Sequence, residues 1–427
     1  MENLDTLIYP QNPHWEKTPT VKPEKKWPKL RAYNKAVVWL DKHPIIALTG
    51  LRRTGKSTAL LQIKDKLEGE TPLKNIFYFS FEKSQVKFHP DSLREILYWY
   101  FDKIIKNIPQ GLTERVYIFL DEVQYIPYWQ DVLKTFYDQS QNIKFLISGS
   151  TSLFIKNKTL ESLAGRIVEI IVTPLSFKEF WQIKGIKGKA ENLIKSRPNY
   201  LNGIFEDYLN YGQFPEIVRE NFTLDEAKEY LKSIEEKILD QDIPKIYPVQ
   251  KVDILKLAYF YATINTGSIV EFNNLAPDLG TDQRTTAKYF DYLKEGYLLN
   301  FCLNQTKKPI RSARTGKKVY LESTNMATVS APMKVENYVF NWLKAKGEVK
   351  FHRLKDFEVD FVLKSKEGIL PVEVKYQEKI KPSDYGNLVK LAKVEKIGRA
   401  MLVSKNLKKT VEVGGITIDI VPAVLLR

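Results

Sequence analysis

The segment from residue 50 to residue 58 has the residue types and spacing of a loop that binds a phosphate. Its first eight residues, GLRRTGKS, fit the pattern G-x-x-x-x-G-K-[ST] in full. The glycines allow backbone N–H groups to turn inward around a phosphate, and a helix that starts at the end of the loop adds the positive end of its dipole. The sequence therefore predicts a nucleotide site formed by Gly50, Leu51, Arg52, Arg53, Thr54, Gly55, Lys56, Ser57 and Thr58.

Two side chains of this loop have expected chemical roles. Lys56 would reach the β- and γ-phosphates of ATP, and Ser57 would be a ligand of Mg²⁺. A chance glycine turn in a basic stretch is the alternative. The surroundings favour the phosphate loop, because a strand-like run (45–49) precedes it and a helical run (57–67) follows it. ATP and Mg²⁺ are therefore the expected cofactors.

Two carboxylates follow another short apolar run, residues 116–120. Asp121 would hold Mg²⁺, and Glu122 would orient or deprotonate the attacking water, as hydrolysis requires. The alternative is a pair of acids at the start of a helix, where acids are common. The phosphate loop upstream favours the catalytic interpretation.

The next apolar run, residues 143–147, ends in serines. Ser148 or Ser150 could contact the γ-phosphate or the attacking water, although Ser150 or Ser152 could simply cap a following helix.

Two further charged residues lie near the expected site. Arg166 is a candidate for contacting the phosphate charge as it develops, within the chain or across a subunit boundary, and its alternative is a surface arginine. Glu82 follows another strand-like run, residues 76–81, and is expected at the same sheet edge without an assigned role.

A second group of candidate catalytic residues lies near the C-terminus. Asp360 and Glu373 fall on two candidate strands joined by a tight turn, and Glu373 and Lys375 should leave the same face. The spacing D-x12-E-x-K matches the PD-(D/E)xK nuclease pattern, in which the acids bind Mg²⁺ and the lysine orients or activates water. Glu336, in the preceding helix, resembles the extra helix acid of such nucleases. The alternatives are a strand with a solvated charged face, or a nuclease fold that binds without cleaving.

Between these two groups, three helical runs (251–263, 270–275 and 281–294) could form a helix-turn-helix. Gln283, Arg284 and Lys288 would reach bases if the third helix entered the major groove. Residues 246–300 carry five basic and six acidic side chains, so their net charge gives little electrostatic attraction for DNA.

A basic loop, residues 307–318, follows the three helical runs. Its side chains could follow phosphates, or the region could be a packing module with a solvated loop. The candidates for DNA contact in this loop are Lys307, Lys308, Arg311 and Arg314.

These residues need elements to position them. Residues 30–175 alternate helical and continuous apolar strand-like runs, which predicts an α/β fold with a parallel sheet covered on both faces. Residues 1–29 hold five prolines and are predicted to form an extended arm, with Trp15 and Trp27 attaching it to the body. Residues 176–245 are predicted to be helical, and strands dominate after residue 345.

Composition excludes several classes of protein. The chain has 427 residues, a formal charge of +15 and ordinary globular hydrophobicity. Its single cysteine excludes an intramolecular disulfide and a Cys-rich zinc site, and no signal or membrane-spanning segment is apparent, so we expect a cytoplasmic protein without a membrane partner. Residues 201–300 carry 10 basic and 17 acidic side chains and residues 301–427 carry 25 and 13, so a polyanion is expected at the final third.

The order of the motifs GLRRTGKST, VYIFLDEVQYIPYW, FLISGSTSLFI, LAGRIVEIIVTPLSFKEFW and YLNYGQFPEIV resembles prokaryotic AAA-type ATPases that carry a C-terminal DUF4143 domain. The resemblance covers nearly the whole chain. It implies a P-loop NTPase core of the AAA/ASCE type at 30–175, with five strands and the phosphate-loop strand central. It further implies a helical lid (176–245), a winged-helix-like module (246–320) and a restriction-endonuclease-like α/β domain (330–427). One departure is YLESTNMA at 320–327, where many relatives have an aspartate.

The expected function is a Mg-ATP-hydrolysing ATPase that couples its nucleotide state to the winged-helix and nuclease-like domains and acts on DNA. One alternative is an ATP-dependent switch that regulates a protein partner, with a nuclease-like domain that binds but does not cleave. Another is a nucleotide binder without turnover. The expected partners are ATP or ADP, DNA, and a second copy of the chain or another protein.

Overall fold

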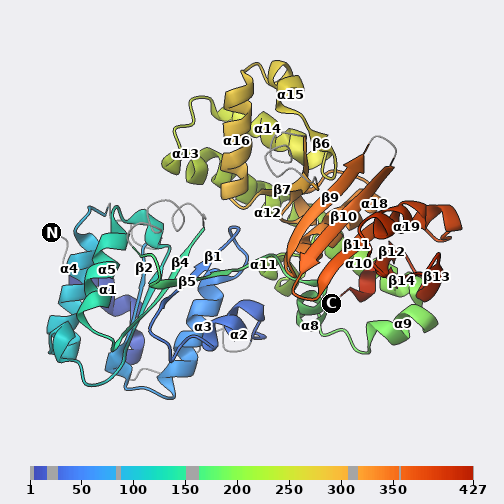
Figure 1. The fold of residues 1–427 in the computed structure, drawn as a ribbon. Helices are drawn as coiled ribbons and strands as arrows, with labels where there is room; N and C mark the ends of the chain where they lie inside the picture. The colour runs from blue at the N-terminus through green and yellow to red at the C-terminus, as the bar shows by residue number, and fades with distance from the viewer. Residues whose placement is uncertain are drawn as a thin grey trace. The chain divides into compact units, whose positions relative to one another are not determined.

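The computed structural model describes residues 4–16, 27–82, 88–150, 163–305, 316–354 and 357–426. The chain divides into two compact units, Met1–Thr173 and Pro174–Arg427 (Figure 1).

The first unit is built on a parallel sheet, which has five strands within the described residues and the order β2-β3-β4-β1-β5. The predicted five-stranded parallel P-loop fold is confirmed. The expectation that the phosphate-loop strand is central is wrong in detail, because β4 takes the middle position and β1 lies between β4 and β5. The strands are β1 (Ile45–Thr49), β2 (Ile76–Ser80), β3 (Val116–Asp121), β4 (Ile143–Gly149) and β5 (Ile167–Ile171).

Helices cover both faces of this sheet (Figure 1). Alternate residues of β1 point to opposite faces: Ile45 and Ala47 pack with α4 and α5, and Ile46 and Leu48 pack with α2 and α3. Burial on both faces is why the strands are continuously apolar in sequence. The helices are α2 (Arg31–Val37), α3 (Lys56–Glu68), α4 (Ser92–Tyr100) and α5 (Trp129–Gln139).

The N-terminal segment differs from the predicted extended arm. Its described part forms short helical turns, α1 (Leu4–Ile8), Tyr9–Gln11 and Pro13–Glu16. These turns pack on edge strand β2, where the Asn12 side chain donates to Tyr78 O at 2.9 Å and accepts from Tyr78 N at 2.8 Å. Trp15 Nε1 donates to Ile76 O at 2.9 Å. The prolines prevent a long helix, but the unpaired peptide groups of an edge strand favour a bound segment over a free arm.

The second unit begins with helices, as the sequence predicts for this stretch. Two of them begin with a capping box, Ser176 with Glu179 and Thr223 with Glu226. The helices are α8 (Phe177–Ile183), α9 (Ala190–Ser196), α10 (Pro198–Asn210), α11 (Pro215–Arg219), α12 (Leu224–Lys237) and α13 (Ile243–Ile246).

Three helices and three strands follow. The helices are α14 (Val252–Ile264), α15 (Phe272–Asp278) and α16 (Gln283–Glu295), and the strands are β6 (Ile269–Val270), β7 (Leu299–Asn304) and β8 (Lys317–Leu321). Asp282 caps α16 by accepting from Arg284 N at 2.8 Å and Thr285 N at 3.0 Å. The predicted basic loop ends earlier than expected, because Lys317 and Lys318 belong to β8.

The C-terminal part contains α18, α19 and six further strands. Strand β7 pairs in parallel with β9, so one mixed sheet has the order β13-β14-β12-β11-β10-β9-β7-β8-β6 within the described residues. Helix α19 and strand β13 were not predicted. The elements are α18 (Ala331–Lys344), β9 (Glu348–Leu354), β10 (Phe357–Ser365), β11 (Gly368–Lys375), α19 (Gly386–Val394), β12 (Arg399–Ser404), β13 (Lys409–Val413) and β14 (Ile416–Pro422).

Among the described residues, no helix combines the length and the apolar character needed to cross a bilayer.

Candidate functional site

The phosphate loop connects the end of β1 to the start of α3, and its backbone requires glycine at two positions. Gly50 has φ 136°, and a Cβ atom there would lie 2.3 Å from the carbonyl oxygen of Val172. Gly55, which precedes the first residue of α3, has φ 98°. Any other residue at these positions would be strained, so the tight turn into the helix depends on both glycines.

Lys56 lies folded back over this loop. Its Nζ donates to the carbonyl oxygens of Gly50, at 3.1 Å, and Leu51, at 3.0 Å, and its side chain is buried. Thr54 Oγ1 also donates to Leu51 O, at 2.8 Å. These contacts hold an ammonium group inside the loop, at the amino end of α3 where the helix dipole favours an anion.

Ser57 and Asp121 meet at the carboxyl edge of the sheet. Ser57 Oγ donates to Asp121 Oδ1 at 3.0 Å, and Tyr78 OH donates to Asp121 Oδ2 at 3.1 Å. Ser148 Oγ donates to Asp121 and accepts from Glu122 N at 3.0 Å. Hydroxyl and carboxylate oxygens are the ligands that Mg²⁺ prefers, so Ser57 and Asp121 fit this ion and would hold it.

Glu122 lies beside this pair and is almost fully buried. Its backbone has φ 55°, and Gln124 Nε2 donates to its carboxylate and to Ser150 Oγ, the latter at 3.0 Å. Burial raises the pKa of Glu122, and the Lys56 ammonium partly offsets this shift. Gln124 was not among the predicted site residues, although its position two residues after Glu122 was the available signal.

The arginines of the loop have different surroundings. Arg52 is buried and pairs with Glu82, which follows β2, so the residue left without a role contacts the phosphate loop. Arg53 is exposed, with φ 65°.

Arg166 lies at the opposite edge of the sheet. Ile45 N, at the start of β1, donates to Arg166 O at 2.8 Å, and Ile45 pairs in register with Ile167. Arg166 therefore precedes β5 at the amino edge, whereas the phosphate loop follows the carboxyl end of β1, about 15 Å away along the strand. Its side chain pairs with Asp138 at 2.9 Å. The predicted contact with phosphate inside this chain is wrong, and a contact across a subunit boundary remains a prediction.

In the second unit, the predicted hairpin brings Asp360 and Glu373 together. Asp360 Oδ2 accepts from Val374 N at 2.8 Å, and Glu373 Oε2 accepts from Asp360 N at 3.4 Å. Lys375 Nζ contacts Glu373 Oε1 at 2.8 Å, on the same strand face as expected. Burial raises the pKa of Asp360, and it raises the pKa of Glu373 to about 7.

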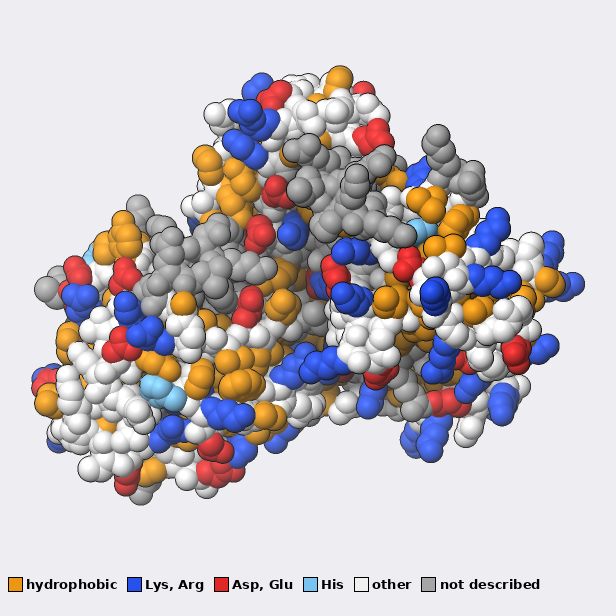
Figure 2. Space-filling model, in the orientation of Figure 1, with side chains coloured by type: hydrophobic (Ala, Val, Ile, Leu, Met, Phe, Trp, Pro, Cys, Tyr) orange, Lys and Arg blue, Asp and Glu red, His pale blue; other side chains and the backbone are white. Residues whose placement is uncertain are grey.

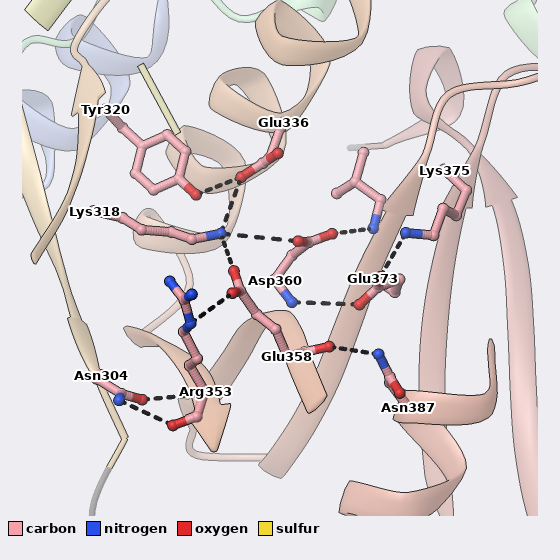
Figure 3. A network of polar contacts seen from close by, with 11 residues as sticks. Asn304, Lys318, Tyr320, Glu336, Arg353, Glu358, Asp360, Glu373, Lys375 and Asn387 are labelled. Atoms are coloured by element: carbon pink, nitrogen blue, oxygen red, sulfur yellow. Dashed lines mark hydrogen bonds and ion pairs between the residues drawn. The ribbon is translucent and has the colours of Figure 1, made fainter. Parts of the chain in front are cut away.

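Lys318 lies at the centre of this group (Figure 3). Its Nζ is 2.7 Å from Glu358 Oε1, 3.5 Å from Glu336 Oε1 and 3.9 Å from Asp360 Oδ1. Lys318 was predicted to lie in a basic loop, and Glu358 was not among the predicted site residues. The available signal was strand alternation, because Lys318 shares a face with Tyr320, whose hydroxyl donates to Glu336 Oε1 at 2.6 Å.

The predicted nuclease residues do not fit a Mg²⁺ ion as they lie here. Within the described ranges, no three His, Cys, Asp or Glu side chains are placed to hold a metal ion. An ammonium group stands among the carboxylates instead. Asp360, Glu373 and Lys375 are adjacent as predicted, but Asp360 and Glu373 are not arranged as an open pair of ligands.

The predicted DNA-contacting residues fall into two sets. Gln283, Arg284 and Lys288 are exposed in the first half of α16. The candidates in the predicted basic loop lie outside the described residues; they are Lys307, Lys308, Arg311 and Arg314.

Comparison with known protein families agrees with this geometry. Residues 42–181 match the model of an AAA domain, and residues 333–425 match DUF4143, a domain of unknown function. The chain carries an AAA domain and a DUF4143 domain. Residues 202–328, between them, match a further domain of unknown function, DUF8612.

Similar chains occur in bacteria and archaea. A protein of Haemophilus influenzae described as uncharacterized is 26% identical over 397 residues, which are 90% of this chain and 94% of that protein. An uncharacterized protein of Methanocaldococcus jannaschii is 26% identical over 357 residues, covering 78% of this chain and 76% of its own.

Solved structures with a similar arrangement include the Walker-type ATPase of Pyrococcus abyssi, with 17% identity, a TM-score of 0.43 and coverage of 73% of this chain and 97% of that one. The RuvB Holliday junction branch migration motor of Thermotoga maritima has 17% identity, a TM-score of 0.31 and coverage of 66% and 92%.

Proposed function

We propose that this protein binds ATP with Mg²⁺ at the AAA domain and hydrolyses it. The contact between Ser57 and Asp121 carries the proposal, because it joins the phosphate loop to the strand end that bears the two carboxylates. Lys56 lies in the same loop, and Glu122 follows Asp121 directly. A loop that only turned the chain would need neither the buried ammonium nor the paired acids.

Each side chain has a role in this proposal. Lys56 exchanges its two carbonyl partners for phosphate oxygens, and the N–H groups at the start of α3 bind the same phosphates. Ser57 and Asp121 hold Mg²⁺, which screens the charge on the phosphates when it is bound. Glu122 accepts the proton of the water whose oxygen attacks the γ-phosphorus, and the bond from that phosphorus to ADP breaks. Gln124 keeps the Glu122 carboxylate in place.

Phosphate release from ATP by the purified protein tests this proposal. Lys56→Ala should abolish release, because the phosphates lose their cationic partner. Lys66→Ala is the matched control, since Lys66 lies on the same helix but pairs with Glu70 on its exposed surface. Equal release by the parent protein and Lys56→Ala would contradict the proposal.

The nucleotide state, in this proposal, switches the protein between two arrangements with different affinity for a partner. Helix α16 favours DNA as the partner. Gln283, Arg284 and Lys288 are exposed in its first half, and Asp282 caps its amino end. On the face drawn in Figure 2, basic side chains of the second unit are scattered rather than gathered into one patch.

The second candidate function is a switch in which the DUF4143 domain binds a partner without cleaving it. The position of the Lys318 ammonium among Glu336, Glu358 and Asp360 favours it over a metal-dependent nuclease. Intact single- and double-stranded DNA after incubation with the protein and Mg²⁺ or Mn²⁺ would support this candidate, and cleavage that Asp360→Asn removes would contradict it.

A further inference from the structure

The DUF4143 domain contains an acidic cluster that consists of Glu336, Glu358, Asp360 and Glu373. The carboxylates converge from α18, β10 and β11 (Figure 3). Their side chains are largely or partly buried, so water solvates them poorly. Four acids in such a place require cations. Lys318 and Lys375 supply two of them, and Arg353, at the rim, supplies a third, with its Nε 3.5 Å from Glu358 Oε2.

Lys318 is fixed by its strand. It is paired in register with Ile269 of β6 on one side and with Cys302 of β7 on the other. Only 7% of its side chain is exposed, so its ammonium group depends on the cluster for solvation. Burial alone would lower the pKa of Lys318, but Glu336, Asp360 and Glu358 outweigh it and raise the pKa above its ordinary value. The lysine is therefore charged where it stands.

The contacts of Lys318 match the chemistry of an ammonium group. Three carboxylates lie around its Nζ, at 2.7, 3.5 and 3.9 Å, and an ammonium has three N–H donors. The carboxylate oxygens that face away are also engaged: Asp360 Oδ2 accepts from Val374 N at 2.8 Å, and Glu373 is bound by Lys375. A Mg²⁺ or Mn²⁺ ion would need several of these oxygens at about 2.0–2.2 Å, and it would be repelled by the ammonium.

We propose that Lys318 is a built-in cation that takes the place of a divalent metal ion in the acidic cluster. Because Lys318 belongs to β8 and the acids belong to α18, β10 and β11, the same contact fastens the β6–β8 strands to the DUF4143 domain. This inference does not depend on ATP turnover by the AAA domain.

Binding of Mn²⁺ to the full-length, nucleotide-free protein tests the proposal, with free Mn²⁺ measured by electron paramagnetic resonance. We expect the parent protein to bind no ion that depends on the cluster. Lys318→Met should create such a site, with Mn²⁺ bound at least about tenfold more tightly than by the parent. Asp360→Asn added to Lys318→Met should remove it. Any binding at the phosphate loop is common to all variants and cancels in these comparisons.

Lys317→Met is the matched control. Lys317 is the neighbouring strand residue, and its ammonium lies over the rings of Phe272 and Phe301 rather than among the acids. It should behave as the parent does.

Two results would overturn the proposal. One is a bound Mn²⁺ ion in the parent protein that Asp360→Asn removes, because the lysine would then not occupy the metal position. The other is a folded Lys318→Met protein without new Mn²⁺ binding, because the cluster would then not be a cation site. If Lys318→Met does not fold, the parent and Asp360→Asn decide alone: equal Mn²⁺ binding supports the proposal, and a difference overturns it.

Discussion

At the scale of single residues, the proposed ATP site is a set of short contacts around the end of β3. Asp121 is held by hydroxyl groups from three different segments, Ser57, Tyr78 and Ser148. Glu122 is held by a side chain, Gln124, that also contacts Ser150. In the proposed function, these contacts place Asp121 to bind Mg²⁺ and Glu122 to accept a proton.

Gln124 is expected to act as a positioning residue for Glu122. In Gln124→Ala the carboxylate loses its amide partner, so kcat for ATP hydrolysis should fall about tenfold while KM for ATP stays within about twofold. Steady-state kinetics measure both constants. Gln110→Ala is the control, because Gln110 is exposed in a turn before β3. An unchanged kcat in Gln124→Ala, or a change confined to KM, would remove this role.

Single residues were predictable where a local pattern determines their position. Gly50, Gly55, Lys56 and Ser57 follow from one contiguous motif, and the adjacency of Asp360 and Glu373 follows from strand period and a short turn. Gln124 was missed although it lies two residues after Glu122, because the sequence does not show that its side chain turns back to that carboxylate. Lys318 was missed because its contacts depend on segments far apart in the chain. Arg166 was misplaced although the signal was present. It directly precedes the apolar run 167–172, and in a parallel sheet the residue before a strand lies at the amino edge, opposite the phosphate loop.

At the scale of elements, the junction between the helices and the C-terminal domain is a buried polar network. Gln213, which follows α10, donates from its backbone to Asn325 Oδ1 at 2.7 Å and from Nε2 to Thr324 Oγ1 at 2.8 Å. Asn325 Nδ2 donates to Tyr208 O and Leu209 O, both at 3.0 Å. These bonds satisfy carbonyl groups at the end of α10, so Asn325, within the segment YLESTNMA, has a structural role.

Asn325→Ala should therefore destabilise the second unit. The change leaves buried donors and acceptors without partners, and we expect a loss of about 2 kcal/mol in the free energy of unfolding. Urea unfolding followed by circular dichroism measures it. Asn273→Ala, at an exposed position on α15, should change the free energy by less than about 0.5 kcal/mol. Similar values for the two variants would mean that the network contributes little.

The contact between α12 and α14 is expected to depend on pH. Tyr259 OH donates to Glu235 Oε1 at 2.7 Å, and burial raises the pKa of Glu235 to about 7. The folded-state pKa is above the unfolded value, so the protonated carboxyl favours folding at acid pH. This contribution is lost between about pH 4.5 and pH 7 as the group ionises.

Glu235→Gln should remove that loss. We expect the variant to be more stable than the parent by about 2 kcal/mol at pH 8 and equally stable at pH 4. Thermal unfolding at the two pH values measures the difference. Glu229→Gln, at an exposed position on the same helix, should show no such pH dependence. A gain of equal size at both pH values would rule out ionisation of Glu235 as the cause.

Elements were predicted best where the apolar residues repeat regularly over a long stretch of sequence. The five parallel strands and the helices α8, α10, α12, α14, α15 and α16 were found from period and caps, with ends differing by a few residues, whereas α9, α11 and α13 were not predicted individually. Helix α19 was missed because it is short and two lysines interrupt its apolar residues, and strand β13 was missed because its only apolar residues are Val411 and Val413. The extended N-terminal arm was wrong because proline content forbids a long helix but not short helical turns that pack on an edge strand.

At the scale of the whole molecule, the charge of +15 is the feature that sequence alone left least explained. Part of it is internal: Lys56 lies in the phosphate loop, and Lys318 balances acids in the DUF4143 domain. These buried cations cannot contribute to a surface for polyanions. DNA binding therefore rests on exposed residues such as Arg284 and Lys288.

DNA binding by α16 is expected to be weak and dependent on salt. Arg284→Ala with Lys288→Ala should reduce affinity for duplex DNA, and each lost phosphate contact should reduce the slope of log K against log salt by about 1. Fluorescence anisotropy at several salt concentrations measures the slope. Lys294→Ala, an exposed residue in the last turn of α16, is the control. If all three proteins have the same slope, α16 is not the contact.

In the proposed reaction, Glu122 accepts the proton from water in a site that Lys56 and Ser57 form for ATP, and a comparison of three proteins tests this role. The experiment compares Mg-ATP binding and phosphate release by the purified parent protein, Glu122→Gln and Glu114→Gln. Glu114→Gln is the control, because the Glu114 side chain contacts Asn75 near the start of β3. We predict that all three bind Mg-ATP with similar affinity, that parent and control release phosphate, and that Glu122→Gln releases at least about a hundredfold less. Phosphate release by Glu122→Gln at the rate of the parent protein would contradict the account.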